Sequence, residues 1–467
     1  MAGTWSALKN QPSFNAGTLL LLTDGTVMCQ DSGTANWWRF SPDSSGSYAA
    51  GTWSVLASGP NAPLYFVSAV LKDGRVLVAG GEYDNGSQVD LLAAEIYDPV
   101  TDSWTPIATP DGWTHIGDAP SCVLPDGKVL IGSIDDIRTA IYDPAANQWT
   151  AGASKDDSSS EETWTLIPDG TVLSVECTNL PRSEKYVASA NKWVSAGNTP
   201  SALPQPCPGI VGEIGPALLL PDGRVFAIGA SGNTALYSPS ANASSPGSWA
   251  AGPTMLDANG KTLFAMDAPA CLLPNGNVLV CGSPSPPCDY PPPTTFLEFE
   301  APSNKLTLVP SPGNAGTPCF QGRMLLLPTG QVLFANGSND VEVYSPEGTS
   351  DPAWKPQITT VPSTVKPKQT CTLQGRQLNG LSQAVSYGDD AQMATNYPLV
   401  CLRSIADDRV FYARTFDHST MGVATGSVIH STQFQVPSDV SVGVYQLFVI
   451  ANGIWSDPAE VKMDPNS

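Results

Sequence analysis

Three carboxylic acids stand at one position of a motif that repeats along the chain, and such residues hold cations or transfer protons. Asp118, Glu161 and Asp267 each come nine residues before the turn glycine of their copy, and Glu213 comes ten residues before it in a fourth copy. Equivalent positions in a closed ring of repeats converge on its central channel. Because like charges at short range do not all stay ionised, we expect the site to contain a compensating group.

Three kinds of compensation suit these residues. A hard divalent cation such as Ca²⁺ is satisfied by oxygen ligands, here the three acids with Gln321, which occupies the same position in the last copy. Two carboxyl groups with separated pKa values serve as general acid and base on a sugar, a lactone or a peptide-like substrate. A cationic ligand would use the same charges together with the aromatic faces of Tyr65 and Tyr83.

A structural interpretation of the acids competes with these. The carboxylates would then accept hydrogen bonds from backbone amides at the start of each repeat and point away from the axis. Residues 117–120 (GDAP) and 266–269 (MDAP) are nearly identical, which favours one shared turn for Asp118 and Asp267.

The repeats themselves predict the elements that position these residues. An apolar run, a turn ending in glycine and a second apolar run occur seven times, at intervals of 43 to 54 residues. Asp-Gly between apolar runs is a strong hairpin signal. Most copies continue with an aromatic residue, a proline turn and a tryptophan, so each unit is predicted to hold four strands, as in a kelch blade. The turn glycines are Gly25, Gly74, Gly127, Gly170, Gly223, Gly276 and Gly330.

We therefore predict an all-β chain in which residues 1–351 form a seven-bladed kelch-type β-propeller. The last repeat lacks its tryptophan strand, whereas the chain opens with an unpaired segment around Trp5, so the N-terminal strand is expected to complete blade 7. Residues 352–467 lack the turn motif and alternate apolar with polar positions, which predicts an immunoglobulin-like β-sandwich. The proline-rich residues 283–295 are expected to be a structural loop or a lid.

Charge and composition restrict the partners. The chain carries 22 basic and 43 acidic residues, a net charge of −21, which argues against nucleic acid and anionic membranes. No run of 18 apolar residues is present, so no membrane span is expected. We expect a monomer whose partner is a small molecule.

Ten cysteines and three glycosylation sequons (Asn85, Asn242, Asn336) favour a secreted or periplasmic protein. The N-terminus lacks the pattern of a signal peptide, so the chain is either the mature form of an exported protein or a cytoplasmic one. Cys281 could pair with Cys288, and Cys371 with Cys401. Cys122 and Cys271 occupy equivalent apolar strands and are expected to be buried thiols.

The sequence resembles the galactose oxidase and glyoxal oxidase family of copper radical oxidases. Residues 71–104 resemble that family's second repeat, and residues 434–461 resemble the end of its C-terminal domain. The resemblance implies a copper site at the mouth of the propeller. In the family this site uses a cysteine cross-linked to a tyrosine, a Tyr-His pair from the last repeat and a histidine from the C-terminal domain.

The position that carries the repeat-borne copper ligands in this family is the one nine residues before the turn glycine. By this resemblance Ala16 replaces the cross-linking cysteine, Tyr65 matches its tyrosine, and Phe320-Gln321 replaces the Tyr-His pair. His418 matches the C-terminal histidine, and Tyr83 takes the place of a stacking tryptophan. Copper(II) favours imidazole ligands, so the resemblance in fold does not extend to the copper radical cofactor.

Three further residues are candidates for the mouth. His418 is expected there as a ligand or as a general acid or base. His115 stands three residues before Asp118 and is expected at the rim. Arg323 alternates to the same side of its strand as Gln321 and would hold an anionic or hydroxylated ligand, or pair with the neighbouring acids.

The predicted function is that of a galactose-oxidase-like propeller without a copper radical site. It would bind a carbohydrate or another small polar ligand at a carboxylate-lined mouth, with or without a divalent cation. A non-oxidative enzyme would use Glu161, His418, Asp118 and Tyr65 as its catalytic residues, whereas a lectin-like protein would only bind. The alternatives are a copper-dependent alcohol or aldehyde oxidase using Tyr65 and His418, and a kelch scaffold for protein partners.

Overall fold

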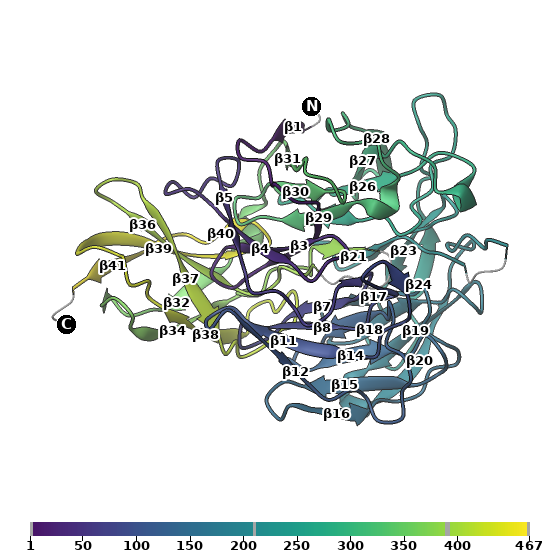
Figure 1. Ribbon diagram of the computed structural model, residues 1–467, viewed down its shortest axis with the longest axis horizontal. Coiled ribbons are helices and arrows are strands. Elements are labelled where there is room, and N and C mark those ends of the chain that lie inside the picture. Colours follow the sequence, from purple (N-terminus) through teal and green to yellow (C-terminus); the bar gives the residue numbers. More distant parts are fainter. Residues whose placement is uncertain (1–2, 209–211, 388–392, 465–467) are drawn as a thin grey trace.

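The structure is a computed structural model that describes residues 3–208, 212–387 and 393–464, and its regular elements are almost entirely β-strands. A ring of sheets lies beside a second group of strands formed by the C-terminal part of the chain, green to yellow in Figure 1. The predicted all-β propeller fold is confirmed. None of the helical segments in the described ranges is long or apolar enough to span a bilayer.

Each blade is a four-stranded antiparallel meander, and the strands of the first four blades follow one another along the chain. Blade 1 holds β2 (Ala16–Leu21), β3 (Val27–Asp31), β4 (Trp37–Ser41) and β5 (Thr52–Val55). Blade 2 holds β7 (Val67–Val70), β8 (Val76–Ala79), β11 (Ala94–Asp98) and β12 (Ser103–Pro106). Blade 3 holds β13 (Ser121–Val123), β14 (Val129–Gly132), β15 (Thr139–Asp143) and β16 (Gln148–Ala151). Blade 4 holds β17 (Thr163–Leu166), β18 (Val172–Val175), β19 (Arg182–Val187) and β20 (Lys192–Asn198).

Blades 5 and 6 keep the same strand order, whereas blade 7 takes its outer strand from the N-terminal part of the chain. Blade 5 holds β21 (Ala217–Leu219), β22 (Val225–Ile228), β23 (Thr234–Ser238) and β24 (Ser248–Ala251). Blade 6 holds β25 (Ala270–Leu272), β26 (Val278–Gly282), β27 (Thr295–Glu300) and β28 (Lys305–Leu308), and β35 (Val385–Ser386) adds to its inner edge. Blade 7 holds β29 (Arg323–Leu326), β30 (Val332–Ala335), β31 (Glu342–Ser345) and β1 (Thr4–Ala7).

The ring closes between the two ends of the propeller chain. Trp5 in β1 stands opposite Tyr344 in β31, as Trp104 stands opposite Tyr97 in blade 2. Innermost strands of neighbouring blades contact one another around the ring, and β29 contacts β2 to complete it. Closure removes the free sheet edge that an open array would expose.

The repeated turns explain why Gly and Asp recur. All seven turn glycines have φ between 76° and 91°, a conformation that glycine adopts without steric conflict. In six of the turns the aspartate or asparagine before the glycine accepts a backbone hydrogen bond from the residue after the glycine, as Asp24 does from Thr26 at 3.0 Å. Each turn therefore places the start of its inner strand at one end of the ring and its glycine at the other.

The C-terminal strands pack against the turn end of the propeller. They form β32 (Gln357–Thr360), β33 (Thr364–Val365), β34 (Thr370–Arg376), β36 (Leu399–Ser404), β37 (Val410–Phe416), β38 (Ile429–Gln435), β39 (Gly443–Ala451), β40 (Ile454–Trp455) and β41 (Ala459–Met463). Tyr412 of β37 lies against Gly25, and Arg414 donates to the Asp73 carbonyl at 3.2 Å. This packing leaves the opposite end of the ring uncovered by the C-terminal sheet.

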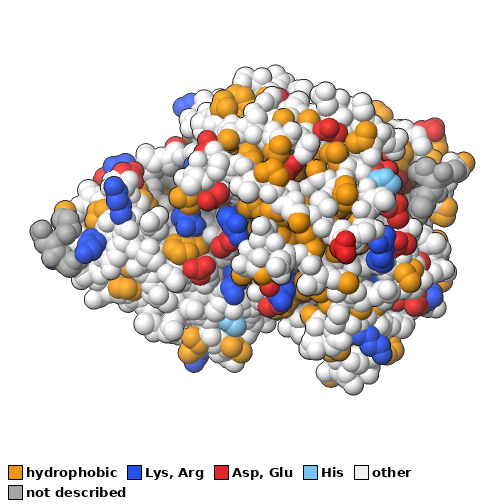
Figure 2. Space-filling model, turned by 60° about the horizontal axis from the view of Figure 1, so that its bottom comes forward, with side chains coloured by type: hydrophobic (Ala, Val, Ile, Leu, Met, Phe, Trp, Pro, Cys, Tyr) orange, Lys and Arg blue, Asp and Glu red, His pale blue; other side chains and the backbone are white. Residues whose placement is uncertain are grey.

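Short elements decorate that uncovered end. A small sheet joins β6 (Pro63–Leu64), β9 (Tyr83–Asp84) and β10 (Ser87–Gln88). The 3₁₀ turns are η1 (Ala188–Ala190), η2 (Pro287–Asp289), η3 (Cys319–Gln321) and η4 (Pro352–Trp354), of which η2 and η3 contribute to the mouth. On the face shown in Figure 2, acidic and basic side chains are interspersed with hydrophobic ones.

Candidate functional site

A pocket of about 680 Å³ opens at the end of the ring where the inner strands begin. This volume lies in the range of small-molecule sites, roughly 300–1,000 Å³. Carboxylates and aromatic rings from blades 2 to 7 line it, together with one residue of the C-terminal part. The principal lining residues are Tyr65, Glu82, Tyr83, Asp90, Asp118, Asp135, Glu161, Glu213, Asp267, Tyr290, Phe320 and Tyr387.

The tightest group of acids in the pocket is Glu161, Glu213 and Asp267. One carboxylate oxygen of each lies within 4.8 Å of the other two. Glu213 is 8% exposed, and its Oε2 has no hydrogen-bond partner among the described residues. A buried carboxylate oxygen without a donor is unfavourable unless a cation or proton supplies the missing interaction.

Two of these acids have an unusual, left-handed backbone conformation that sets the direction of their side chains. Glu161 and Asp267 have φ of 62° and 48°, and Tyr65 at the equivalent position has 53°. The left-handed region is uncommon for such residues, and where it occurs the surrounding structure holds it in place, often at functional sites.

Asp118 lines the same pocket but does not join the tight group. The expected shared turn is wrong in detail, because the left-handed residue is Gly117 in one copy and Asp267 itself in the other. The shift by one residue gives the two side chains different directions, so Glu213 takes the place in the group that the sequence had assigned to Asp118.

Aromatic groups surround the acids. The rings of Tyr65 and Tyr83 meet edge to face with centroids 6.1 Å apart, so Tyr83 does not stack on Tyr65. Burial and the nearby Glu82 carboxylate raise the pKa of Tyr83. His115 lies at the rim, half exposed, with Nδ1 3.1 Å from Oδ2 of Asp135, which itself lines the pocket.

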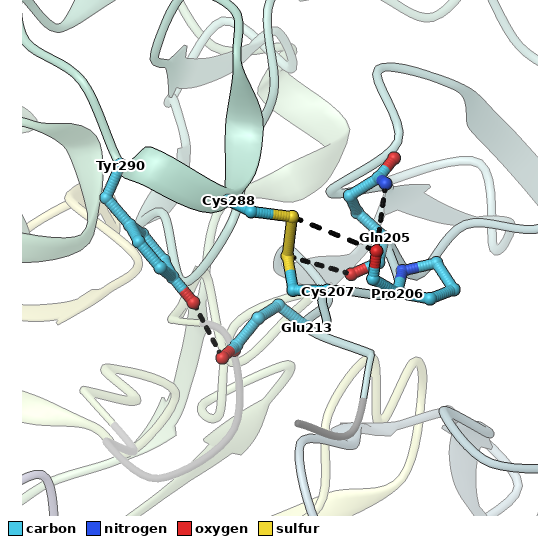
Figure 3. The surroundings of a disulfide bond; sticks show 6 residues. All are labelled: Gln205, Pro206, Cys207, Glu213, Cys288 and Tyr290. Atoms are coloured by element: carbon cyan, nitrogen blue, oxygen red, sulfur yellow. Dashed lines mark hydrogen bonds between the residues drawn. A yellow bond between two sulfur atoms is a disulfide. The ribbon is translucent and has the colours of Figure 1, made fainter. Parts of the chain in front are cut away.

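Sequence reasoning missed Tyr290, which the proline-rich loop delivers to the mouth. Its hydroxyl donates to Oε1 of Glu213 at 2.8 Å (Figure 3). Burial and then the charge of Glu213 raise the pKa of Tyr290 well above its usual range, so the hydroxyl keeps its proton and remains a donor. The richness in proline predicted a loop or lid, and the tyrosine within it was the available signal.

The same loop is fastened by a disulfide between Cys207 and Cys288 (Figure 3). The expected pairing of Cys281 with Cys288 is therefore wrong, because Cys281 points into the blade from β26 with no exposed surface. Cys371 and Cys401 are also unpaired with each other, since both are free buried thiols. Cys122 and Cys271 are buried and free, as predicted.

Tyr387 is the residue that the C-terminal part brings to the mouth. It follows β35, which pairs with β25 inside the ring, and its hydroxyl donates to the Phe320 carbonyl at 2.7 Å. Residues 386–400 hold Asp389 and Asp390 without the spacing of an EF-hand loop, so their sequence predicts a surface turn, but Tyr387 is 2% exposed and lines the pocket. Asp389 and Asp390 lie outside the described residues.

His418 does not lie at the mouth. Its backbone N–H donates to the Lys72 carbonyl at 3.4 Å, in the turn that follows β7, whereas Tyr65 precedes β7. Its ring Nδ1 lies 2.9 Å from the Thr432 hydroxyl, and burial lowers its pKa to about 3. The expectation that this loop enters the channel was wrong because it ends against the opposite, turn end of the ring.

Gln321 and Arg323 line a separate pocket of about 170 Å³, divided from the first by Leu64 and Tyr65. The guanidinium carbon of Arg323 lies 3.7 Å from the centroid of Tyr387 and 5.6 Å from that of Tyr65. Its Nη1 also donates to the Phe320 carbonyl at 2.9 Å. Arg323 therefore supports the aromatic wall between the two pockets.

Comparisons with known proteins agree with this architecture. Residues 63–110 match the model of the Kelch motif. No curated protein matches the chain. A solved structure of a fungal alcohol oxidase of the AA5 family, in complex with copper, is 14% identical, with a TM-score of 0.55 over 99% of both chains.

Two further solved structures resemble about three quarters of the chain. A streptogramin B lyase is 10% identical with a TM-score of 0.51, covering 74% of this chain and 99% of its own. A catalytically inactive virginiamycin B lyase from Staphylococcus aureus, solved with quinupristin, is 10% identical with a TM-score of 0.51, covering 73% of this chain and 99% of its own. At these identities the similarity establishes a galactose-oxidase-like kelch fold and leaves the chemistry to the site.

Proposed function

We propose that the mouth of the propeller binds a divalent cation, with Ca²⁺ as the ion of choice, together with a carbohydrate or another small polar ligand. The observation that carries the proposal is the group of Glu161, Glu213 and Asp267, whose oxygens approach within 4.8 Å. Ca²⁺ takes oxygen ligands at about 2.3–2.6 Å, so oxygens on opposite sides of one ion are separated by about this distance. The unpartnered Oε2 of Glu213 gains a partner when the ion binds.

The aromatic residues around the acids favour a sugar as the polar ligand. Tyr65, Tyr83 and Phe320 present faces and edges to the same pocket, on which the apolar C–H faces of a sugar ring pack. Tyr290 and the carboxylates offer hydrogen-bond donors and acceptors for hydroxyl groups. The cation would hold two of those hydroxyls while the rings set the orientation of the ligand.

The residues of this pocket do not suit a copper radical centre. None of the described residues that line it is a histidine or a cysteine, and copper(II) favours imidazole nitrogen. By the resemblance, Ala16 stands where the family has its cross-linked cysteine, and Phe320-Gln321 stands where the family has Tyr-His. An oxidase using Tyr65 with His418 is disfavoured, because these residues stand at opposite ends of β7.

Calorimetric titration with Ca²⁺ tests the binding step. Glu213→Gln should weaken Ca²⁺ binding at the mouth strongly, whereas Asp90→Asn, which removes a charge from the same pocket outside the tight group, should not. Equal affinity in both variants and the wild type would refute the cation site. Stoichiometric copper with peroxide release on galactose or glyoxal would instead establish the oxidase.

A second measurement separates an enzyme from a binding protein. Sugars, lactones and glycosides that bind in the presence of Ca²⁺ are incubated with wild type and with Glu161→Gln. Turnover that is lost in the variant while affinity persists would assign Glu161 as an acid–base catalyst. Binding without product in the wild type would assign a lectin-like protein, and a protein partner with neither cation nor small ligand would assign a kelch scaffold.

Compartment and assembly belong to the same proposal. The Cys207–Cys288 disulfide supports an oxidising, secreted or periplasmic location. We expect a monomer that binds neither nucleic acid nor membrane, given the net charge of −21.

A further inference from the structure

Blade 4 contains a second group of acids inside the blade, separate from the mouth. Asp157 precedes β17, Glu176 follows β18, and Glu184 lies in β19 opposite Ser174. One carboxylate oxygen of each lies within 4.8 Å of the other two. The side chains of Asp157, Glu176 and Glu184 are 8%, 0% and 4% exposed, so solvent does not screen them.

One cation already present is Lys155, but it is committed elsewhere. Its ammonium group forms a buried ion pair with both oxygens of Glu162 and lies 3.7 Å from Asp157 and 3.9 Å from Glu184. Glu162 is further satisfied by the Ser174 hydroxyl at 2.7 Å and the Trp164 indole N–H at 3.1 Å. Lys155 and Glu162 therefore neutralise each other and leave the charges of the other three acids largely uncompensated.

The second cation nearby is Arg182, and it faces outward. Its Nε lies 4.0 Å from Oε2 of Glu176, while its Nη2 bonds to the exposed Asp156. Both oxygens of Glu176 and both oxygens of Asp157 lack a hydrogen-bond partner among the described residues. Four buried carboxylate oxygens without a donor represent a large unfavourable free energy unless a further positive group is bound.

We propose that Asp157, Glu176 and Glu184 bind a Ca²⁺ ion inside blade 4. The spacing of their oxygens suits an ion whose ligands stand about 2.3–2.6 Å from it. The ion would supply the partner that Glu176 and Asp157 lack and would join the segment before β17 to the ends of β18 and β19. This site shares no ligand with the mouth, so it does not rest on the proposed function.

The burial of all three acids makes this a structural site, because no substrate reaches side chains enclosed inside a blade. Glu162, which packs beside the acids, directly follows Glu161, whose carboxylate lines the mouth. Protons are the alternative source of compensation: burial raises the pKa of Glu176 to about 8 and that of Glu184 to about 7. Ca²⁺ would replace those protons near neutral pH.

Calcium stoichiometry in three proteins separates this site from the mouth. We expect the wild type to bind two ions, and Glu176→Gln and Glu213→Gln to bind one each. If Glu176→Gln binds as many ions as the wild type, the blade site is refuted. If the wild type binds a single ion and only Glu213→Gln removes it, the site in blade 4 is refuted and the site at the mouth is supported. If only Glu176→Gln removes that ion, the site at the mouth is refuted and the site in blade 4 is supported.

The stability of the Glu176→Gln variant provides a check that it folds. In EDTA the glutamine replaces a buried carboxyl group that has no hydrogen-bond partner among the described residues, so the variant should melt at or near the wild-type temperature, whereas added Ca²⁺ should raise Tm less than in the wild type. Tb³⁺ gives a readout on unmutated protein, since Trp193 lies 5.3 Å from the Lys155 ammonium group. Terbium emission that is excited through tryptophan should appear in the wild type and should be weaker in Trp193→Phe. If the wild type shows no such emission, the site in blade 4 is refuted.

Discussion

Removing the disulfide between Cys207 and Cys288 should destabilise the propeller and loosen its mouth at the same time. The bond closes a loop spanning 81 residues, for which chain entropy gives about 4.5 kcal/mol of stabilisation. Without it, the loop that carries Tyr290 is held only by non-covalent contacts. A hydrogen bond to a charged group contributes about 1.5–3 kcal/mol. If the loss of the Tyr290–Glu213 bond costs the lower end of this range, binding at the mouth should weaken roughly tenfold, because about 1.4 kcal/mol corresponds to a factor of ten in affinity.

The assay compares the wild type with the double variant Cys207→Ser/Cys288→Ser. Urea unfolding is followed by tryptophan fluorescence with and without reductant, and Ca²⁺ binding is measured under the same conditions. The wild type in reductant should match the double variant, whereas the double variant should not respond to reductant. The unreduced, denatured wild type should expose eight reactive thiols, because eight of the ten cysteines are free.

Three results would refute this reasoning. Ten reactive thiols before reduction would show that the bond does not form. A Cys281–Cys288 peptide in a digest would show a different arrangement of the loop. An equal response of the wild type and the double variant to reductant would place the effect at another cysteine.

Three other predictions follow from the packing. Trp5→Ala should lower the free energy of unfolding by about 3 kcal/mol, because the indole packs on Phe296, Phe334 and Tyr344 and donates to the Pro310 carbonyl. The control variant Trp5→Phe should lose less stability, and equal losses in the two variants would contradict this account. His418 is buried, and its pKa is about 3 in the folded chain, below the value near 6.5 in the unfolded chain. Between these pH values the unfolded chain binds the additional proton, so the free energy of unfolding decreases as pH falls through this range. His418→Asn should make the free energy of unfolding depend less on pH without affecting ligand binding. Arg323→Lys should lower stability by about 1 kcal/mol through the loss of the planar contact with Tyr387, measured by urea unfolding, and no change would show that the contact is dispensable.

The blades were predictable because their signals are local. Each turn needs a residue with positive φ, and six of the seven have an aspartate or asparagine before it; both are visible within a few positions, as at Asp24 and Gly25. The tryptophan missing from the last repeat and present at Trp5 showed how the ring closes, because the register opposite Tyr344 repeats that of the other blades.

The mouth was predictable only in part. Tyr65, Glu161 and Asp267 were found because a repeat position is also a position around the axis. The left-handed residue is Gly117 in the turn of Asp118 but Asp267 itself in the equivalent turn, and the near-identical sequences of these two turns conceal the shift that leaves Asp118 outside the tight group.

Long-range contacts escaped prediction. Tyr290 and Tyr387 reach the pocket through a disulfide-anchored loop and through β35, and no repeat marks either residue. His418 was assigned to the mouth by resemblance alone, but the direction of its loop is set by packing against Lys72 and Thr432.

The central claim is our proposal that acids at the mouth of this propeller hold a divalent cation and that no copper radical centre is built there. Anomalous scattering from a crystal soaked in Mn²⁺, a divalent ion that accepts the same oxygen ligands, tests it most directly. We predict a peak within coordinating distance of Glu161, Glu213 and Asp267. The mouth empty of Mn²⁺, or copper bound beside Tyr65 in crystals grown with both metals, would contradict the account.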